Sequence, residues 1–457
     1  MGLQAPAALL TSFIPMFLIA GAFFYMNRAD PDAGTTFSWV TRAMGPWAGW
    51  IGGWAICTTG ILVIGSLADV GARYFYLLVE ADGAADSRVA VTALACGVIV
   101  VMTAVCVMGT ELSARTQNVL IIGQVAALLV FAAVALVKVY GGDAGEGSIR
   151  PEAGWFSPFA VEEFSSLVGA LLLGVFIYWG WESAVNLTEE TTDSTRAPGL
   201  AAVASTVILL LTYVGVATAV VAFAGLDVLA EFDDDEGIFA FLGADVLGTP
   251  WDKIVVLSIV TSAIASTQTT IIPASRTTFS MARAEAMPAA MARIHPRFRT
   301  PHVSTIVIAI LAMAWYVPAN FASENFLFDT LSALSLMIAF YYGLSGLACA
   351  IYHRRELLRS TKNFLFMGVS PLVGAGMLYY LFAKSVIDLS DPENSYTGTS
   401  WLGVGPPLVI GVGFLLLGCV LVVVWRLGGH ERFFIRKPFE AVDPDVAAGR
   451  VKVGAET

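Results

Sequence analysis

The sequence contains few charged residues for its length. Only 13% of its 457 residues are Asp, Glu, Lys or Arg, whereas about a quarter of a soluble domain is charged. Hydrophobic residues make up 57% of the chain, and the mean hydropathy is +0.75. This composition excludes an ordinary soluble protein and indicates that most of the chain lies in lipid.

Cysteine and histidine are also scarce, and neither type is spaced like a set of metal ligands. The five cysteines fall inside apolar stretches, where a free cysteine behaves as a small buried apolar residue. The four histidines lie in connecting segments. The sequence also contains no catalytic dyad and no cofactor motif, so a membrane enzyme is a distant alternative. We expect no cofactor, no metal ion and no nucleic acid partner.

The apolar residues gather into long stretches. A helix needs about 20 of them to cross a bilayer, and about eleven stretches meet this requirement. None alternates with the period of two that is typical of a membrane barrel, so helices remain the way to satisfy the backbone in lipid. We predict an all-α integral membrane protein, with a transmembrane domain over residues 1–427 and a partly disordered tail over 428–457. The predicted spans are 6–26, 46–79, 88–109, 118–140, 166–187, 200–225, 253–282, 303–317, 328–352, 363–386 and 406–425.

The charges that are present separate into two sets of loops. Most of the 25 Lys and Arg residues fall in alternate connecting segments and in the C-terminal tail, whereas the opposite loops carry acid, including the run 233–236. By the positive-inside rule, the basic segments and the tail are cytoplasmic. An odd number of crossings would then place Met1 on the outer face. We therefore expect that one helix is absent from the sequence, either because its start is mis-assigned or because the helix is truly lost.

One predicted span contains an interruption. Residues 175–186 read Val-Phe-Ile-Tyr-Trp-Gly-Trp-Glu-Ser-Ala-Val-Asn, which places Glu182 at membrane depth beside Gly180. An ionisable group in the membrane is costly and is a functional-site hypothesis by default, and glycine lets the backbone leave helical geometry. Discontinuous helices in transporters bind substrates and ions with the backbone groups that a break frees. The alternative is a packing glycine flanked by lipid-facing aromatics, with Glu182 paired to a neighbouring helix.

The predicted helix 253–282 carries a stripe of hydroxyl groups. Ser262, Ser266 and Thr270 are spaced four residues apart, on one helical face. Such a stripe could line a path for a cation or a substrate. Hydroxyls in membrane helices also commonly bond to the carbonyl of residue i−4, and this alternative is equally open.

The predicted helix 46–79 is longer than a bilayer requires, at about 50 Å for a rise of 1.5 Å per residue. It must therefore tilt steeply or extend beyond the membrane. Gly60 and Gly65 lie within it, and small residues allow a close helix crossing. Asp69 and Arg73 are spaced i,i+4, which favours a structural ion pair over a role in transport.

Three motifs, taken in order, resemble those of the amino acid–polyamine–organocation permeases. Residues 30–35 (Asp-Pro-Asp-Ala-Gly-Thr) with 42–45 (Arg-Ala-Met-Gly) are similar to the loop between that family's second and third helices. Residues 180–182 (Gly-Trp-Glu), followed by Glu189-Glu190 and 196–198, resemble its sixth helix. Residues 275–288 resemble the end of its eighth helix. The order and spacing of these motifs cover almost the whole chain.

The resemblance implies a fold of two inverted five-helix repeats plus two further helices, of which this chain would hold the second to the twelfth. It implies a carrier of amino acids, polyamines or related cations. It also implies Phe176 as a gate-like aromatic, the stretch from Tyr178 to Gly180 as the unwound substrate contact, and Glu182 as a gating or proton-linked carboxylate. Ser266 would occupy the ion site of sodium-coupled relatives. The expected substrate-binding residues are Phe176, Tyr178, Trp179, Gly180, Trp181, Thr58 and Thr270; the expected gating or coupling residues are Glu182, Ser262, Ser266 and Gln124.

Three departures from the family pattern are visible. Arg283-Ala284-Glu285 stands where Arg-Asp-Gly is usual, and Gln124 stands where many proton-coupled members carry a lysine. The loop 31–34 follows the first predicted span rather than the second, so the expected absent helix is the family's first, which supplies the other half of the substrate site.

These observations lead to two hypotheses of function. The first is a secondary transporter for an amino acid, a polyamine or a related organocation in a bacterial cytoplasmic membrane, coupled to a proton or a sodium ion and working by alternating access. Trp179 and Trp181 could hold an organic cation, although aromatics at a gate would serve a neutral amino acid as well. The second is a non-transporting sensor or an inactive truncated homologue.

Overall fold

The computed structural model describes residues 2–145, 147–161, 164–231, 238–322 and 326–438. Within these residues every regular element is a helix, apart from one isolated bridge between Trp401 and Val404. The longer helices are α1 (Ala5–Ala29), α2 (Thr36–Met44), α3 (Pro46–Leu78), α5 (Arg88–Met108), α6 (Thr110–Gly141), α7 (Phe164–Ile177), α9 (Ala197–Glu231), α10 (Ile238–Leu247), α11 (Asp252–Arg283), α12 (His302–Ala322), α13 (Phe326–Tyr352), α15 (Ser370–Asp388) and α16 (Pro406–Leu427). The short ones are α4 (Asp82–Ala85), α8 (Ser183–Asn186), α14 (Thr361–Asn363) and α17 (Glu431–Phe434).

The predicted all-α membrane fold is confirmed. Ten helices of the described chain are long and apolar enough to cross a membrane. Each predicted span coincides with one of them or with the interrupted pair α7 and α8. The predicted end at residue 317 is too early, because α12 continues past Pro318 to Ala322. A proline is tolerated in a membrane helix where neighbouring groups satisfy the carbonyl that it leaves free.

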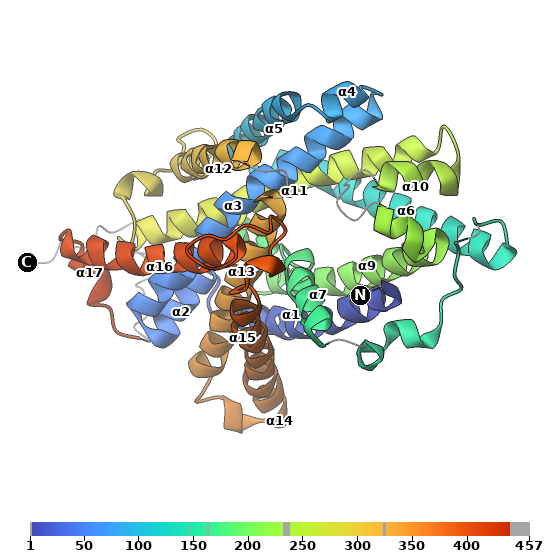
Figure 1. Ribbon diagram of the computed structural model, residues 1–457. Helices are drawn as coiled ribbons and strands as arrows, with labels where there is room; N and C mark the ends of the chain where they lie inside the picture. The colour runs from blue at the N-terminus through green and yellow to red at the C-terminus, as the bar shows by residue number, and fades with distance from the viewer. Residues whose placement is uncertain (1, 146, 162–163, 232–237, 323–325, 439–457) are drawn as a thin grey trace, which may run out of the picture.

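The helices α3 and α13 form the centre of the molecule. In both, 83% of the most apolar 18-residue window is buried, whereas the corresponding value for α6 is 22%. The most extensive helix contact joins α3 to α11, and the two run across the middle of Figure 1. A Cβ added at Gly60 of α3 would lie 2.6 Å from Cβ of Ala274 on α11. The absence of a side chain at Gly60 therefore permits this close crossing, as predicted for the glycines of α3.

The first helix packs beside the interrupted one. In Figure 1, α1 lies next to α7 and α9, and it also contacts α13 and α15. Phe23 of α1 is 1% exposed and meets three aromatic rings edge-on, those of Trp39, Trp181 and Tyr342. These rings join α1 to α2, to the interruption and to α13, and they fix the walls around the broken helix.

The beginning of the predicted tail is folded against the helices. Phe433 of α17 is fully buried and stacks on Phe37 of α2, with ring centroids 5.7 Å apart. Phe434 packs on Trp47 at the start of α3, and Arg426 lies over the same ring. The short helix α17 is therefore packed against α2 and α3. The predicted disorder of the tail otherwise concerns residues 439–457, which lie outside the described part of the chain, as does the acidic run 233–236.

Candidate functional site

The interruption between α7 and α8 has a defined geometry. Helix α7 ends at Ile177, α8 begins at Ser183, and the residues between them form turns. Gly180 has φ of +108°, a backbone conformation that residues with a side chain rarely adopt. Ile177 is the last residue of α7, and its carbonyl accepts a hydrogen bond from the hydroxyl of Tyr213 on α9 at 3.1 Å. The predicted break at Gly180 is therefore present.

The facing helix α11 offers a second irregularity. Pro273 lies inside α11 and has no N–H with which to bond the carbonyl of Thr269, four residues earlier. That carbonyl accepts a hydrogen bond from the hydroxyl of Ser183 at 3.0 Å. The two breaks in regular hydrogen bonding are thus joined, and the start of α8 is fixed to α11.

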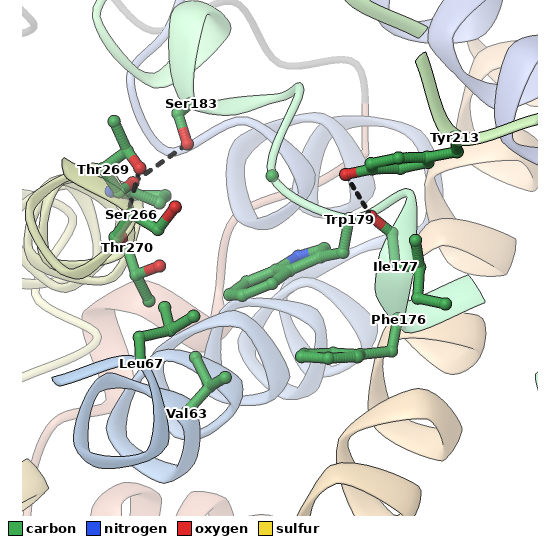
Figure 2. Close-up of a pocket in the computed structure, with 12 residues that line it drawn as sticks. Val63, Leu67, Phe176, Ile177, Trp179, Ser183, Tyr213, Ser266, Thr269 and Thr270 are labelled. Carbon is green, nitrogen blue, oxygen red and sulfur yellow. Dashed lines mark hydrogen bonds between the residues drawn. The ribbon is translucent and has the colours of Figure 1, made fainter. Parts of the chain in front are cut away.

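A cavity of about 310 Å³ lies between the broken helix and its neighbours. Figure 2 shows the indole of Trp179 extending into it from the interruption, with Ser266 and Thr270 of α11 on the opposite wall. None of the twelve lining side chains is charged. The lining residues are Val63, Leu67, Phe176, Ile177, Trp179, Gly180, Ser183, Tyr213, Ser266, Thr269, Thr270 and Pro273.

The carboxylate of Glu182 lies beside this cavity but does not line it. Its side chain is 1% exposed. Oε1 accepts hydrogen bonds from Nε1 of Trp179 at 2.9 Å and from the hydroxyl of Tyr341 at 2.7 Å. Oε2 accepts from the hydroxyl of Tyr342 and from the backbone N–H of Gly180 at 3.3 Å. A buried carboxylate is therefore stabilised by four donors, two of which come from α13.

Comparison with known proteins identifies the family. A sequence model described as amino acid permease matches residues 1–423, which is nearly the whole chain. The chain belongs to the amino acid permease family. The predicted resemblance to the amino acid–polyamine–organocation permeases is thereby confirmed.

The permease is similar in sequence to transporters of several kinds. It is 23% identical over 402 residues to the methylthioribose transporter of Bacillus subtilis (strain 168), covering 83% of this chain and 81% of that one. It is 23% identical over 373 residues to a branched-chain amino acid permease of the same organism, covering 77% and 74%. The Asc-type amino acid transporter 1 of Homo sapiens is 24% identical over 410 residues, covering 88% and 72%. These relatives are permeases and transporters rather than enzymes, and the chain is a multi-pass membrane transporter.

The permease also shares its fold with a solved transporter. The crystal structure of a mutant of the Eremococcus coleocola manganese transporter superposes with a TM-score of 0.57, covering 94% of this chain and 89% of that one. The two sequences are 12% identical, so this likeness concerns the fold alone. It confirms the predicted transporter fold.

The three motifs of the permease meet in space at one end of the broken helix. Asn186, the last residue of α8, donates a hydrogen bond to the carbonyl of Ala33 in the loop 30–35 at 2.9 Å. The N–H of Ala33 donates to Oε1 of Glu189 at 3.0 Å. Arg283, at the end of α11, donates two hydrogen bonds to Glu189, at 2.7 and 2.8 Å. Residues far apart in the sequence therefore form one polar cluster.

The charges of this cluster are paired. Arg42 forms ion pairs with Asp30 and Asp32, and Arg276 pairs with Glu190 at 3.0 Å. Burial alone would raise the pKa of Glu189, but the hydrogen bonds and the charge of Arg283 outweigh it and hold that pKa below its ordinary value. We name these residues the ionic cluster: Asp30, Asp32, Arg42, Glu189, Glu190, Arg276 and Arg283.

Five of the residues singled out in the sequence line the cavity: Phe176, Trp179, Gly180, Ser266 and Thr270. Among the described residues, no intramolecular hydrogen bond is recorded for the hydroxyls of Ser266 and Thr270, so both are available to a ligand. Their role in binding stays a prediction.

The other predicted residues lie outside the cavity lining. Thr58 bonds to the carbonyls of Trp54 and Ala55 in its own helix. Tyr178 is fully buried against Tyr213 and Phe13. The remaining predicted residues that do not line the cavity are Trp181, stacked on Tyr342, together with Glu182, Ser262 and Gln124.

Four partners of the break were not predicted from the sequence, namely Tyr213, Pro273, Tyr341 and Tyr342. For Asp69, the sequence favoured an ion pair with Arg73. Asp69 accepts hydrogen bonds from the hydroxyl of Tyr316 and, at 3.3 Å, from Asn320, both on α12. Its pairing with Arg73 stays a prediction.

Proposed function

We propose that the permease is a secondary active transporter that binds a small amino acid in the cavity beside Gly180. The observation that carries this proposal is the break in the helix, because it opens on a cavity that also contains the available hydroxyls of Ser266 and Thr270. Backbone outside helical geometry is tolerated at membrane depth where it lines a cavity, and transporters place their substrate sites there.

The chemistry of the cavity favours a neutral or zwitterionic amino acid over a polyamine. Its lining contains three aromatic rings, those of Phe176, Trp179 and Tyr213, and no charged side chain. A polyamine carries several ammonium groups spread along its length, and each would need a charged or strongly polar partner once it left water. An amino acid has one ammonium and one carboxylate, close together, which the backbone groups freed at the break could bind. An apolar side chain of moderate size would fit against the rings, and about 310 Å³ is near the lower limit for small-molecule sites.

A neutral solute of another class is the second candidate. One relative is named as a methylthioribose transporter, and a sugar with an apolar substituent would likewise use hydroxyl and aromatic contacts. The uncharged lining supports this candidate as well as it supports an amino acid.

We propose that transport proceeds by alternating access and that the ionic cluster holds one end of the pathway closed. The cluster joins the loop 30–35, the segment after α8 and the end of α11, and its ion pairs would have to separate for that end to open. We place this end, together with the C-terminal tail, on the cytoplasmic side of a bacterial inner membrane, since the basic loops lie there by the positive-inside rule. Ser266 and Gln124 remain the candidates for coupling to sodium or a proton.

The test is uptake by the purified full chain in proteoliposomes, with a panel of labelled neutral amino acids, polyamines and methylthioribose. We expect saturable uptake and counterflow of at least one neutral member of the panel. Tight binding of an amino acid without uptake or counterflow would favour the sensor hypothesis. A folded protein that neither binds nor transports any member would contradict the proposal.

A matched pair of variants tests the location of the site. Thr270→Val keeps the shape of the side chain and removes a hydroxyl that faces the cavity, so we expect KM to rise about fivefold, the equivalent of one hydrogen bond of about 1 kcal/mol. Thr261→Val makes the same change on α11 at a hydroxyl that bonds only to its own helix, at 2.9 and 3.0 Å, and should leave KM unchanged.

A further inference from the structure

Trp179 belongs to two environments at once. Its ring lines the cavity, as Figure 2 shows, while Nε1 donates hydrogen bonds to Oε1 of Glu182 and to the hydroxyl of Tyr341. An indole has one N–H and no acceptor, so its orientation depends on where these two oxygen atoms lie. The position of the ring inside the cavity is therefore set by groups outside it.

Both carboxylate oxygens of Glu182 are engaged in hydrogen bonds within the protein. Each of its carboxylate oxygens accepts two hydrogen bonds, from Trp179, Tyr341, Tyr342 and the N–H of Gly180. The side chain is 1% exposed and does not line the cavity. To reach a ligand, the carboxylate would have to leave these donors, which is costly for a buried charge. In this conformation its influence on the ligand passes through Trp179.

Tyr341, on α13, also orients the indole of Trp179. It is fully buried on α13, and its hydroxyl accepts from the indole and donates to Oε1 of Glu182 at 2.7 Å. It does not line the cavity. Loss of that hydroxyl would leave the cavity wall intact and remove one of the two acceptors that orient the indole.

We infer that Tyr341 is a positioning residue for the ligand site, which acts with Glu182 by fixing the indole of Trp179 against the bound solute. This inference rests on the proposed function, because it assigns the cavity to the transported solute. The ring of Trp179 is then the surface that determines specificity. Tyr341 links this surface to α13, a central helix with no residue in the cavity lining.

The experiment is a double-mutant cycle with Tyr341→Phe, Trp179→Phe and the double variant in proteoliposomes. We expect Tyr341→Phe to raise KM about fivefold, as for one hydrogen bond, with a smaller change in turnover. The double variant should match Trp179→Phe alone, because the hydroxyl and its partner Glu182 both reach the solute only through the indole. Tyr379→Phe is the matched control. Its hydroxyl bonds to the carbonyl of Phe340 at 3.4 Å and to neither Trp179 nor Glu182, so its loss should leave KM unchanged.

A fluorescence measurement on the same proteins tests positioning without transport. The spectrum of the wild type minus that of Trp179→Phe isolates the emission of Trp179. The corresponding difference in the Tyr341→Phe background should shift, because the indole loses an acceptor. An unchanged difference spectrum would overturn the inference, and so would additive effects on KM. If the wild type transports nothing, the proposed function falls, and the fluorescence result still decides whether Tyr341 positions Trp179.

A second variant covers the case in which Tyr341→Phe does not fold. Glu182→Leu repeats both readouts, because leucine has no acceptor and the indole of Trp179 then loses its bond to Oε1. The same shift in Trp179 emission is expected, and its absence counts against the inference in the same way.

Discussion

Replacement of Gly180 by alanine tests how far transport depends on the backbone conformation of the break. Gly180 has φ of +108°, and a Cβ added there would meet no atom within 4 Å. Alanine therefore introduces no clash, and its whole effect comes from the conformational preference of a residue with a side chain. Holding such a residue in a sparsely populated backbone region costs about 1–3 kcal/mol. The broken conformation should therefore become about 5- to 140-fold less populated relative to its alternatives.

The assay is the initial rate of uptake in proteoliposomes, together with thermal unfolding in detergent. We expect Gly180→Ala to lose most of its transport. Gly169→Ala is the matched control, because Gly169 lies inside α7 with nothing within 4 Å of an added Cβ, and alanine favours the helix there by about 0.5–1 kcal/mol. This control should transport like the wild type. A Gly180→Ala protein with wild-type KM and turnover would refute the view that the break shapes the site.

Three further predictions concern the groups around the break and the ionic cluster. Glu182→Gln should lower uptake about 5- to 140-fold, because one buried donor is left unsatisfied at a cost of about 1–3 kcal/mol; full uptake at every pH would contradict this. Pro273→Ala supplies an N–H that competes with Ser183 for the carbonyl of Thr269, so turnover should fall while the melting temperature holds or rises; unchanged turnover would show that this contact is dispensable. Arg283→Gln should move the acid unfolding transition to higher pH. The lowered pKa of Glu189 in the folded protein contributes stability that is lost only as the pH falls through that value, below about 4.3, and the variant loses the hydrogen bonds and the charge that lower it. Melting temperatures measured from pH 3 to pH 7 would overlay those of the wild type if this pairing did not matter.

The position of the break was predictable because its signal is local. Within a few residues of one apolar span, the sequence places a glycine, three large aromatics and a carboxylate, a combination that is not expected in a continuous lipid-facing helix. The spans themselves were predictable for a similar reason, since length and hydropathy alone decide them. The structure also places the three motifs together in the ionic cluster, which their order along the chain did not reveal.

The partners of the break were not predictable, because they lie far away in the sequence. Tyr341 is separated from Glu182 by 159 residues. Nothing in the sequence of the span 328–352 indicates that the hydroxyl of Tyr341 donates to a buried carboxylate. Pro273 is different. Its effect on the carbonyl of Thr269 follows from a local rule and could have been used to find the facing wall.

The predicted stripe of hydroxyl groups on α11 lines the cavity only in part. Steps of four residues advance about 40° beyond a full turn of 3.6 residues, so Ser262 is rotated about 80° from Thr270. Ser266 and Thr270 reach the cavity, and Ser262 does not line it. Thr58 illustrates the competing alternative for such groups, because its hydroxyl bonds to carbonyls of its own helix.

An experimental structure of the permease with a transported solute bound would locate the binding site directly. We expect ligand density between the ring of Trp179 and the hydroxyls of Ser266 and Thr270, with the break at Gly180 retained and the carboxylate of Glu182 still bonded to Tyr341. Density elsewhere, such as in the separate cavity of about 280 Å³ lined by Phe241 and Asp245, would contradict it. Density in direct contact with Glu182 would contradict the inferred role of Tyr341.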